Sequence, residues 1–189
     1  MSGEARTGAA LRDAVFVDRD GTLMEDVPYI RDPAAVRIFP GVSEALRRLK
    51  AAGFVIVMAT NQSGIGRGWN TVEQFDAVQA RFFELLGANL IDAVYMCPDA
   101  PGAPSRHRKP EPGMLFDAAR ELGLDLHRSW MIGDKPADVE CGMNAGARPI
   151  QVLTGEGAAH PSEKALQQVV DFSAAADFVL RTSGPVTNE

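Results

Sequence analysis

The hydrophobic pattern of this chain alternates between two kinds of segment. Short apolar runs without polar alternation, which are typical of strands buried on both faces, are separated by stretches whose apolar residues recur at helical spacing. The runs that we expect to form strands are Ala14–Val17, Phe54–Ala59, Ala93–Met96, Trp130–Ile132, Ile150–Leu153 and Phe178–Leu180. Strands that alternate with helices predict a mostly parallel sheet with helices on both faces. We therefore expect an α/β fold with a doubly wound, Rossmann-like sheet.

Prolines, glycines and capping residues mark the expected helices. The first helix follows Pro40 and ends at Gly53. For the second, Asn70 and Thr71 are both possible N-caps, and Gly87 marks its end. Two further helices are expected to begin at Pro112 and Pro136 and to end at Gly123 and Gly146. These helices fall between the expected strands, as an alternating α/β chain requires.

The length and composition indicate one globular unit. A chain of 189 residues can build one sizeable hydrophobic core but is too short to expect two, so we predict a single domain over residues 1–189. Residues 1–13 and 182–189 are expected to be flexible tails. The formal net charge of −6 argues against nucleic acid as a partner, because phosphate backbones select basic surfaces.

Cysteine content and the N-terminal residues bear on the compartment. Cys97 and Cys141 are too few to indicate a disulfide framework. The first residues lack the apolar core of a signal peptide, and no apolar run approaches the length of a membrane span. We therefore expect a cytoplasmic protein without a membrane partner, and we take it to be a monomer.

Two acidic residues follow the first expected strand directly. Asp18 and Asp20 lie where the apolar run ends, and Gly21 marks the turn after them. In open α/β sheets, ligands bind at the carboxyl ends of the strands. The two carboxylates are therefore candidates for chemistry, and an acidic turn that caps the strand is the alternative.

The second expected strand is followed by polar and glycine-rich sequence. Thr60 and Asn61 lead into a segment that runs to Gly68, and its hydroxyl, amide and backbone groups could bind an oxyanion. A dinucleotide-binding fingerprint is disfavoured because Trp69 occupies its third glycine position. A flexible turn is the other interpretation.

Further charged residues come later in the chain. The densest basic patch is Arg106–Pro110, which by itself would be a solvated loop. The fourth expected strand is followed by Asp134 and then by Asp138. Because the strands are expected to be parallel, three of them bring Asp18, Thr60 and Asp134 to the same edge of the sheet.

Four motifs, taken in order, resemble those of haloacid dehalogenase superfamily phosphatases. They are Asp-x-Asp-Gly-Thr at 18–22, a Thr at 60, a Lys at 109 before a helix, and Gly-Asp-x-x-x-Asp at 133–138. More narrowly, residues 18–22, 60–68, 97–98, 108–110 and 133–135 are similar to those of D-glycero-D-manno-heptose 1,7-bisphosphate phosphatases and of the related histidinol phosphatases. The Ser-Gly-Ile-x-Arg-Gly sequence at 63–68 favours the heptose enzymes.

The resemblance implies a Mg²⁺-dependent phosphatase with a covalent intermediate. Asp18 would be the nucleophile that forms an aspartyl-phosphate, and Asp20 would be the general acid and base. Mg²⁺ would be held by the carboxylates of Asp18 and Asp134 and by the backbone carbonyl of Asp20, because oxygen ligands suit this ion. Thr60 and Lys109 would hold the phosphoryl group.

Other residues receive supporting roles. Asn61 would be an additional phosphate contact, and Asp138 would orient Lys109, with a helix N-cap as its alternative role. Arginine matches phosphate geometry with paired hydrogen bonds. The candidates for binding a second phosphate or the sugar hydroxyls, each of which could instead be a surface charge, are Arg67, Arg108 and Lys135.

The segments between the motifs leave no room for a cap domain. The resemblance therefore implies a haloacid dehalogenase fold without a cap, in which substrate selection rests on loops 24–33, 63–70 and 99–108.

One feature of the similar enzymes is altered here. Heptose bisphosphate phosphatases usually carry a zinc loop made of Cys, His, Cys and Cys. This chain keeps Cys97 but has Asp99, Ser105 and His107 where the other ligands are expected. Structural zinc generally needs four sulfur or imidazole ligands, so we predict no structural zinc. A site made of Cys97, Asp99 and His107 is the alternative.

The resemblance thus implies hydrolysis of the 7-phosphate of D-glycero-D-manno-heptose 1,7-bisphosphate. Histidinol phosphate or another small sugar phosphate is the alternative substrate. A non-catalytic phosphoacceptor signalling domain would also present Asp, Thr and Lys at this edge, but such domains lack a carboxylate equivalent to Asp20. A phosphotransferase or mutase is disfavoured because those relatives use a cap to exclude water.

Overall fold

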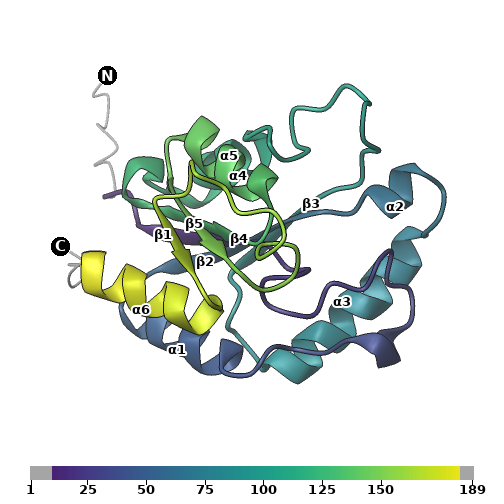
Figure 1. The fold of residues 1–189 in the computed structure, drawn as a ribbon, viewed down its shortest axis with the longest axis horizontal. Helices are drawn as coiled ribbons and strands as arrows, with labels where there is room; N and C mark the ends of the chain where they lie inside the picture. Colours follow the sequence, from purple (N-terminus) through teal and green to yellow (C-terminus); the bar gives the residue numbers. More distant parts are fainter. Residues whose placement is uncertain (1–9, 184–189) are drawn as a thin grey trace, which may run out of the picture.

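A six-stranded sheet forms the centre of the molecule (Figure 1). The computed structural model describes residues 10–183. All neighbouring strands pair in parallel, in the order β3-β2-β1-β4-β5-β6. The strands are β1 (Ala14–Val17), β2 (Val55–Asn61), β3 (Ala93–Cys97), β4 (Trp130–Gly133), β5 (Arg148–Val152) and β6 (Gln167–Val169). This order is that of a doubly wound sheet, which confirms the predicted fold class.

Helices cover both faces of the sheet (Figure 1). One face packs against α1, α3 and α6, and the other packs against α4 and α5. Val15 and Val17 of β1 belong to the first core, whereas Ala14 and Phe16 belong to the second, because alternate strand residues point to opposite faces. The helices are α1 (Val42–Ala51), α2 (Ser63–Gly66), α3 (Val72–Leu86), α4 (Gly113–Leu122), α5 (Pro136–Ala145) and α6 (Phe172–Ser183), with short 3₁₀ turns η1 (Pro33–Ala35) and η2 (Leu126–Arg128).

The predicted helix boundaries are confirmed by the capping contacts. Thr71 accepts a hydrogen bond from the backbone of Gln74, whose side chain accepts one from the Thr71 backbone, so α3 begins with a capping box. Gly123 and Gly146 end α4 and α5 in the left-handed conformation, with φ values of 65° and 79°. Local chemistry therefore fixes where these helices begin and end.

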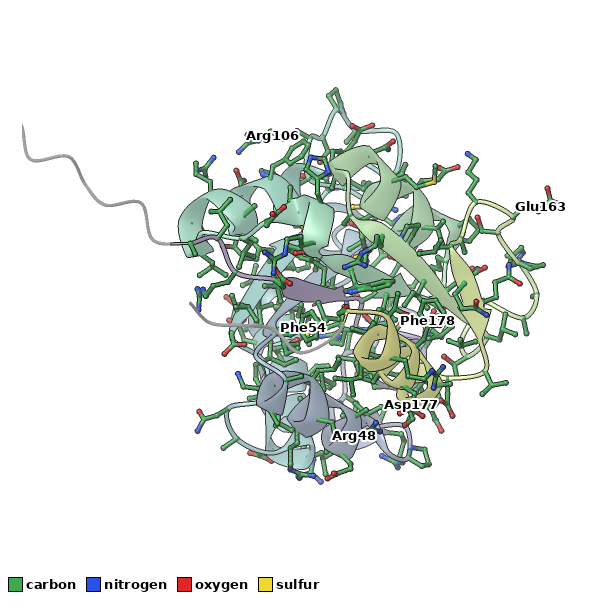
Figure 2. The ribbon with its side chains drawn as sticks, turned by 90° about the vertical axis from the view of Figure 1, so that its left-hand side faces the viewer. Arg48, Phe54, Arg106, Glu163, Asp177 and Phe178 are labelled. Atoms are coloured by element: carbon green, nitrogen blue, oxygen red, sulfur yellow. The ribbon has the colours of Figure 1, made fainter. Side chains whose placement is uncertain are left out.

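The sixth predicted strand is wrong. Residues 178–180 belong to α6. The Phe178 ring meets the Trp130 ring edge to face, with 5.8 Å between their centroids. The neighbouring Asp177 pairs with Arg48 of α1, with 2.7 Å between Oδ1 and Nη2 (Figure 2). An apolar run of three residues is too short to show whether its period is that of a helix or a strand. The sixth strand is instead Gln167–Val169, a polar segment at the sheet edge.

Some residues that were expected to belong to flexible tails are part of the folded domain. Arg12 donates its backbone N–H to Gly123 at 2.9 Å, Asp13 is buried, and Thr182 and Ser183 complete α6. Residues 1–9 and 184–189 lie outside the described part of the chain. Within residues 10–183, no cap domain interrupts the fold and no helix is both long and apolar enough to span a membrane.

Candidate active site

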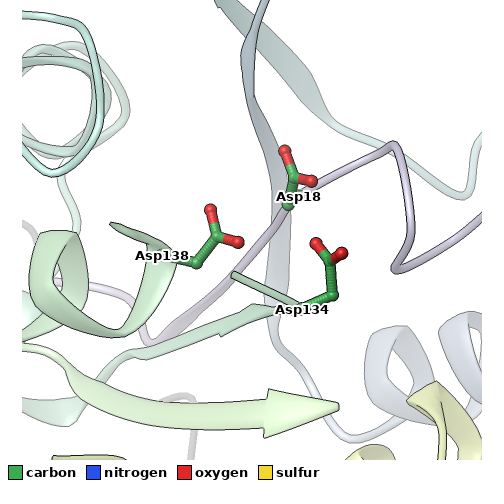
Figure 3. A group of neighbouring side chains, drawn as sticks. All are labelled: Asp18, Asp134 and Asp138. Atoms are coloured by element: carbon green, nitrogen blue, oxygen red, sulfur yellow. The ribbon is translucent and has the colours of Figure 1, made fainter. Parts of the chain in front are cut away.

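The candidate site lies where the direction of winding changes. From β1 the chain builds β2 and β3 on one side, and then returns to place β4 on the other side of β1. Asp18 follows β1 and Asp134 follows β4, and their side chains converge with that of Asp138 at the start of α5 (Figure 3). This switch point is the ligand-binding position of open α/β sheets.

Lys109 is held between two of these acids. Its Nζ lies 2.6 Å from Asp18 Oδ1, 2.6 Å from Asp138 Oδ1 and 2.7 Å from the Ala59 carbonyl oxygen. All three side chains are almost completely buried. The ammonium is thereby fixed beside Asp18, which is the arrangement expected for the third and fourth motifs.

Burial changes the protonation of these groups. Burial raises the pKa of Asp18 to about 7, and repulsion from Asp138 and Asp20 adds to this effect while Lys109 opposes it. Burial likewise raises the pKa of Asp134 to about 8, with further repulsion from Asp18 and Asp138. For Lys109, burial lowers the pKa, but attraction to Asp138 and Asp18 outweighs it and the pKa is raised. The site thus holds more buried carboxyl groups than Lys109 alone can pair with.

Asp134 has the features of a cation ligand. Its Oδ2 accepts a hydrogen bond from the Glu156 backbone at 2.8 Å, whereas Oδ1 is buried without a hydrogen-bond partner. Backbone lies directly against this carboxylate, because a Cβ on Gly21 or Gly155 would overlap Oδ2. A buried carboxylate oxygen without a donor is costly unless a cation binds it.

The three clustered acids are not equivalent. Both oxygens of Asp138 are engaged, Oδ1 by Lys109 and Oδ2 by the backbone N–H of Lys135 at 2.9 Å. Asp18 and Asp134 therefore supply the carboxylates that can hold a divalent ion, and Asp138 fixes Lys109. The same hydrogen bond from the Lys135 backbone shows that Asp138 also caps α5, so both roles considered from the sequence coexist.

Residues at the end of β2 contact Lys109 and the first acidic motif. Asn61 and Lys109 exchange hydrogen bonds, from Nδ2 to the Lys109 carbonyl and from the Lys109 N–H to Oδ1, both at 3.1 Å. Gln62 donates from Nε2 to Asp20 Oδ2 at 2.8 Å and to Thr60 Oγ1 at 2.9 Å. The predicted residues from three strands and the basic loop are therefore brought together.

A pocket of about 220 Å³ opens beside Asp20. Its walls come from residues 26–30 and 61–65, together with Asn70, Phe75 of α3, Lys135 and Glu156. Lys135 Nζ lies 2.9 Å from Asp26 and 3.2 Å from Glu156, so this cation reaches the pocket already paired. The pocket is the space into which the rest of a phosphorylated substrate can extend.

Comparisons with known proteins show the family of this chain. Residues 106–181 match the HAD-hydrolase-like family, in which HAD stands for haloacid dehalogenase. Over 159 residues the chain is 42% identical to the D-glycero-D-manno-heptose-1,7-bisphosphate 7-phosphatase of Thermosynechococcus vestitus, covering 77% of this chain and 81% of that protein. The chain belongs to this 7-phosphatase family. A second member, from Mesorhizobium japonicum, is 40% identical and covers 78% of this chain and 72% of that protein.

A solved structure supports the assignment to the 7-phosphatase family. The D,D-heptose 1,7-bisphosphate phosphatase from B. bronchiseptica, solved with magnesium and phosphate, has a TM-score of 0.80 and 32% identity, and covers 89% of this chain and 98% of that chain. These comparisons confirm the family recognised from the four motifs and show that the chain is a haloacid dehalogenase-type phosphatase.

Two predicted substrate contacts of this 7-phosphatase family member lie away from the pocket. Arg67 is exposed, and its guanidinium lies over the Trp69 ring at 4.7 Å from the centroid. Arg108 donates to the Asp99 carbonyl oxygen at 3.0 Å. Neither side chain lines the pocket as described, whereas Lys135 does. The substrate roles of all three stay predictions.

The loop in which a zinc site was considered is held here by hydrogen bonds. Cys97 Sγ lies 3.4 Å from Asp99 Oδ2 and 3.6 Å from Ser105 Oγ. His107 is directed elsewhere, with Nε2 at 2.8 Å from Asp117 Oδ2. The three residues considered as a possible zinc site are therefore not gathered around one point.

Three residues of the site in this 7-phosphatase family member were missed by sequence reasoning. Gln62, Asp26 and Glu156 contact Asp20 or Lys135, yet none was singled out. A signal existed for Glu156, because the loop after β5 must emerge at the same sheet edge as Asp18 and Asp134. Gln62 directly follows two polar residues that were chosen, and only the fold turns its side chain toward Asp20.

Proposed function

We propose that this chain removes the 7-phosphate of D-glycero-D-manno-heptose 1,7-bisphosphate in a Mg²⁺-dependent reaction. The observation that carries the proposal is the convergence of Asp18, Lys109 and Asp134 at the switch point of the sheet, beside a pocket lined by Asp20. The names of the related proteins and the magnesium and phosphate complex of the solved relative support the substrate and the ion.

The first chemical step forms a covalent intermediate. An oxygen of Asp18 attacks the phosphorus, the bond between phosphorus and the sugar oxygen breaks, and Asp20 gives its proton to the departing oxygen. In the second step, water attacks the phosphorus of the aspartyl-phosphate while Asp20 accepts a proton from that water. Inorganic phosphate leaves, and both carboxylates regain their original states.

Positive charge must surround the phosphoryl group during both steps. Lys109 and the Thr60 hydroxyl are assigned to hold its oxygens, with Asn61 positioned beside them by its paired hydrogen bonds to Lys109. Mg²⁺ bound by Asp18, Asp134 and the Asp20 carbonyl would neutralise charge on the phosphoryl oxygens. The orphaned Oδ1 of Asp134 and the excess of buried carboxylates fit this ion.

Recognition of the sugar is assigned to the pocket and its surrounding loops. Lys135 is the contact best placed by its position in the pocket wall. Arg67 and Arg108 are assigned to the second phosphate, which would require each guanidinium to leave its present partner. We propose that the 98–108 loop needs no structural zinc, and metal analysis of the purified protein tests this, since stoichiometric zinc would overturn it.

The deciding experiment compares substrates. We would measure phosphate release with Mg²⁺ from the heptose 1,7-bisphosphate and from histidinol phosphate at matched concentrations. A large preference in kcat/KM for the bisphosphate is expected. Equal or higher activity on histidinol phosphate would reject the substrate assignment while retaining a phosphatase, and no Mg²⁺-dependent phosphate release from any phosphomonoester would reject the reaction itself.

A further inference from the structure

Arg19, the second residue of the first motif, is a buried arginine with an unusual set of contacts. Its side chain is 1% exposed, although the residue lies between the two acidic residues of the motif. Its Nε and Nη2 both face the carboxylate of Asp20, at 3.0 to 3.3 Å from the two oxygens. Such a fork holds a carboxylate in one plane, whereas a single hydrogen bond lets it rotate.

The guanidinium is itself fixed from the opposite side by α3. Nη1 donates to Gln79 Oε1 at 2.9 Å, and the guanidinium lies over the Phe75 ring at 5.3 Å from its centroid. Gln79 is buried, and its Nε2 contacts the sulfur of Met58 in β2 at 3.6 Å. A helix and a strand of the core thus determine where the fork points.

The two oxygens of Asp20 differ in their contacts. Oδ2 accepts from Gln62 in addition to the Arg19 fork, whereas Oδ1 accepts from Arg19 alone. Both oxygens are therefore held by donors of the protein, and Oδ2 receives one donor more than Oδ1. Asp20 also lines the pocket, where the oxygen of the leaving sugar would lie.

We propose that Arg19, supported by Gln79, is a positioning residue that holds Asp20 for proton transfer to the leaving group. This inference rests on the proposed function, in which Asp20 is the general acid. Arg19 does not touch the substrate; it acts through the carboxylate. A small displacement of a catalytic group can cost about 100-fold in rate, which sets the scale of the expected effect.

The test separates positioning of the acid from general damage. Release of a sugar oxygen needs a proton, whereas 4-nitrophenolate leaves without one. We would therefore measure single-turnover cleavage of the heptose bisphosphate and the 4-nitrophenol burst from 4-nitrophenyl phosphate, for Arg19→Met and Gln79→Leu. For Arg19→Met we expect cleavage of the bisphosphate to slow by about 10- to 100-fold and the burst to change by less than about threefold. Gln79→Leu should show the same selectivity with a smaller loss.

Two further variants make the outcome decisive. Arg148→Met removes a partly buried arginine outside the site, whose guanidinium lies 3.9 Å from the centroid of the Trp130 ring, and should leave both rates unchanged. Asp20→Asn should show the same substrate selectivity as Arg19→Met. If Asp20→Asn slows both substrates equally, the assignment of Asp20 as general acid fails. If Asp20→Asn is selective but the Arg19 variant slows both substrates equally, or neither, the positioning role is overturned; should Arg19→Met not fold, Gln79→Leu decides by the same criterion.

Discussion

Lys109 provides an ammonium that is shared by two buried carboxylates of the site. It reaches Asp18 across 91 positions of sequence, and it contacts Asp138 at the same 2.6 Å. Breaking a buried ion pair is costly when it leaves a charge alone, whereas an amide can replace a carboxylate as a hydrogen-bond acceptor. Isosteric substitutions therefore separate chemistry from folding at these positions.

Asp18→Asn should abolish hydrolysis without unfolding the domain. The amide oxygen can still accept a hydrogen bond from Lys109, but an amide cannot form the aspartyl-phosphate, so activity should fall to background. Phosphate release and thermal unfolding by circular dichroism check both parts. Asp177→Asn, which alters the surface pair with Arg48, is the matched control and should remain active. Multiple turnovers by a folded Asp18→Asn protein would exclude Asp18 as the nucleophile.

The two thiols should be nearly inert in the folded protein. Burial raises the pKa of Cys141 from 9.0 to about 12 and also raises that of Cys97, so both remain neutral thiols at pH 8. For Cys141 the thiolate fraction is lowered on the order of a thousand-fold. Iodoacetamide at pH 8, followed by mass spectrometry, should modify the folded protein slowly and the urea-unfolded protein at both sites. Rapid labelling of Cys141 in the folded state would contradict the expectation.

At the residue scale, three of the four motif positions were predictable because each follows an apolar run. Once the strands are taken as parallel, Asp18, Thr60 and Asp134 must meet at one edge, and the structure brings them there. The orientations of loop side chains were not predictable in this way, because contacts with other residues in the fold determine them. Arg67 lies on Trp69, and Asp26 pairs with Lys135, for reasons that no local pattern contains.

At the scale of elements, α3 contributes both structure and positioning. Val78 and Phe82 pack it into the core on one face of the sheet, while Phe75 and Gln79 contact Arg19 of the first motif. The beginning of the helix is fixed by Thr71, so the register of Gln79 depends partly on the capping box. A substitution at the cap should therefore change the free energy of unfolding, although the cap is remote from the catalytic residues.

Thr71→Ala should lower the free energy of unfolding by about 1 kcal/mol, because it removes the acceptor for the N–H of Gln74. Urea denaturation followed by circular dichroism measures the change, with kcat expected to stay within about twofold of the native value if the helix keeps its register. Thr182→Ala is the matched control, since its hydroxyl donates to the Phe178 carbonyl inside α6 and its loss should be nearly neutral. Equal losses of unfolding free energy at the two positions would show that the capping box stabilises the protein no more than an ordinary hydroxyl contact inside a helix.

The C-terminal elements show where prediction from the sequence stops at this scale. The first five strands are long or apolar enough to be recognised, although their ends differ by one or two residues. The last strand, Gln167–Val169, carries two glutamines and only pairs at the edge with β5, so its sequence lacks a buried-strand pattern. Residues 178–180 form an apolar run that was predicted as a strand, but in the structure they belong to α6 and pack against the core.

At the scale of the whole molecule, an acidic protein has to bind an anionic substrate. The net charge is −6, and the clustered acids at the switch point add local negative potential that Lys109 only partly offsets. Attraction of a phosphate ester to this site therefore depends on bound cations more than on the overall field of the protein. The same dependence should be visible in stability, because an ion that binds only the folded chain stabilises it.

Mg²⁺ should raise the melting temperature by about 5 to 10 °C at a concentration 100-fold above its Kd, and EDTA should reverse the rise. The ion relieves repulsion between Asp18 and Asp134. Burial raises the pKa of Asp134 from 3.8 to about 8, so its ionised form destabilises the fold, and the metal-free protein loses stability as the pH rises from about 4 toward 8.

Asp134→Asn tests the origin of this stabilisation by differential scanning fluorimetry at pH 8.5. The variant should lose the response to Mg²⁺, yet without metal it should melt at or above the temperature of the native protein, because a buried carboxylate has been replaced by a neutral amide. Glu140→Gln alters an exposed carboxylate paired with Lys164 and should keep the full response. If Asp134→Asn retains the Mg²⁺ shift, the ion binds elsewhere and the assignment of Asp134 as a ligand is wrong.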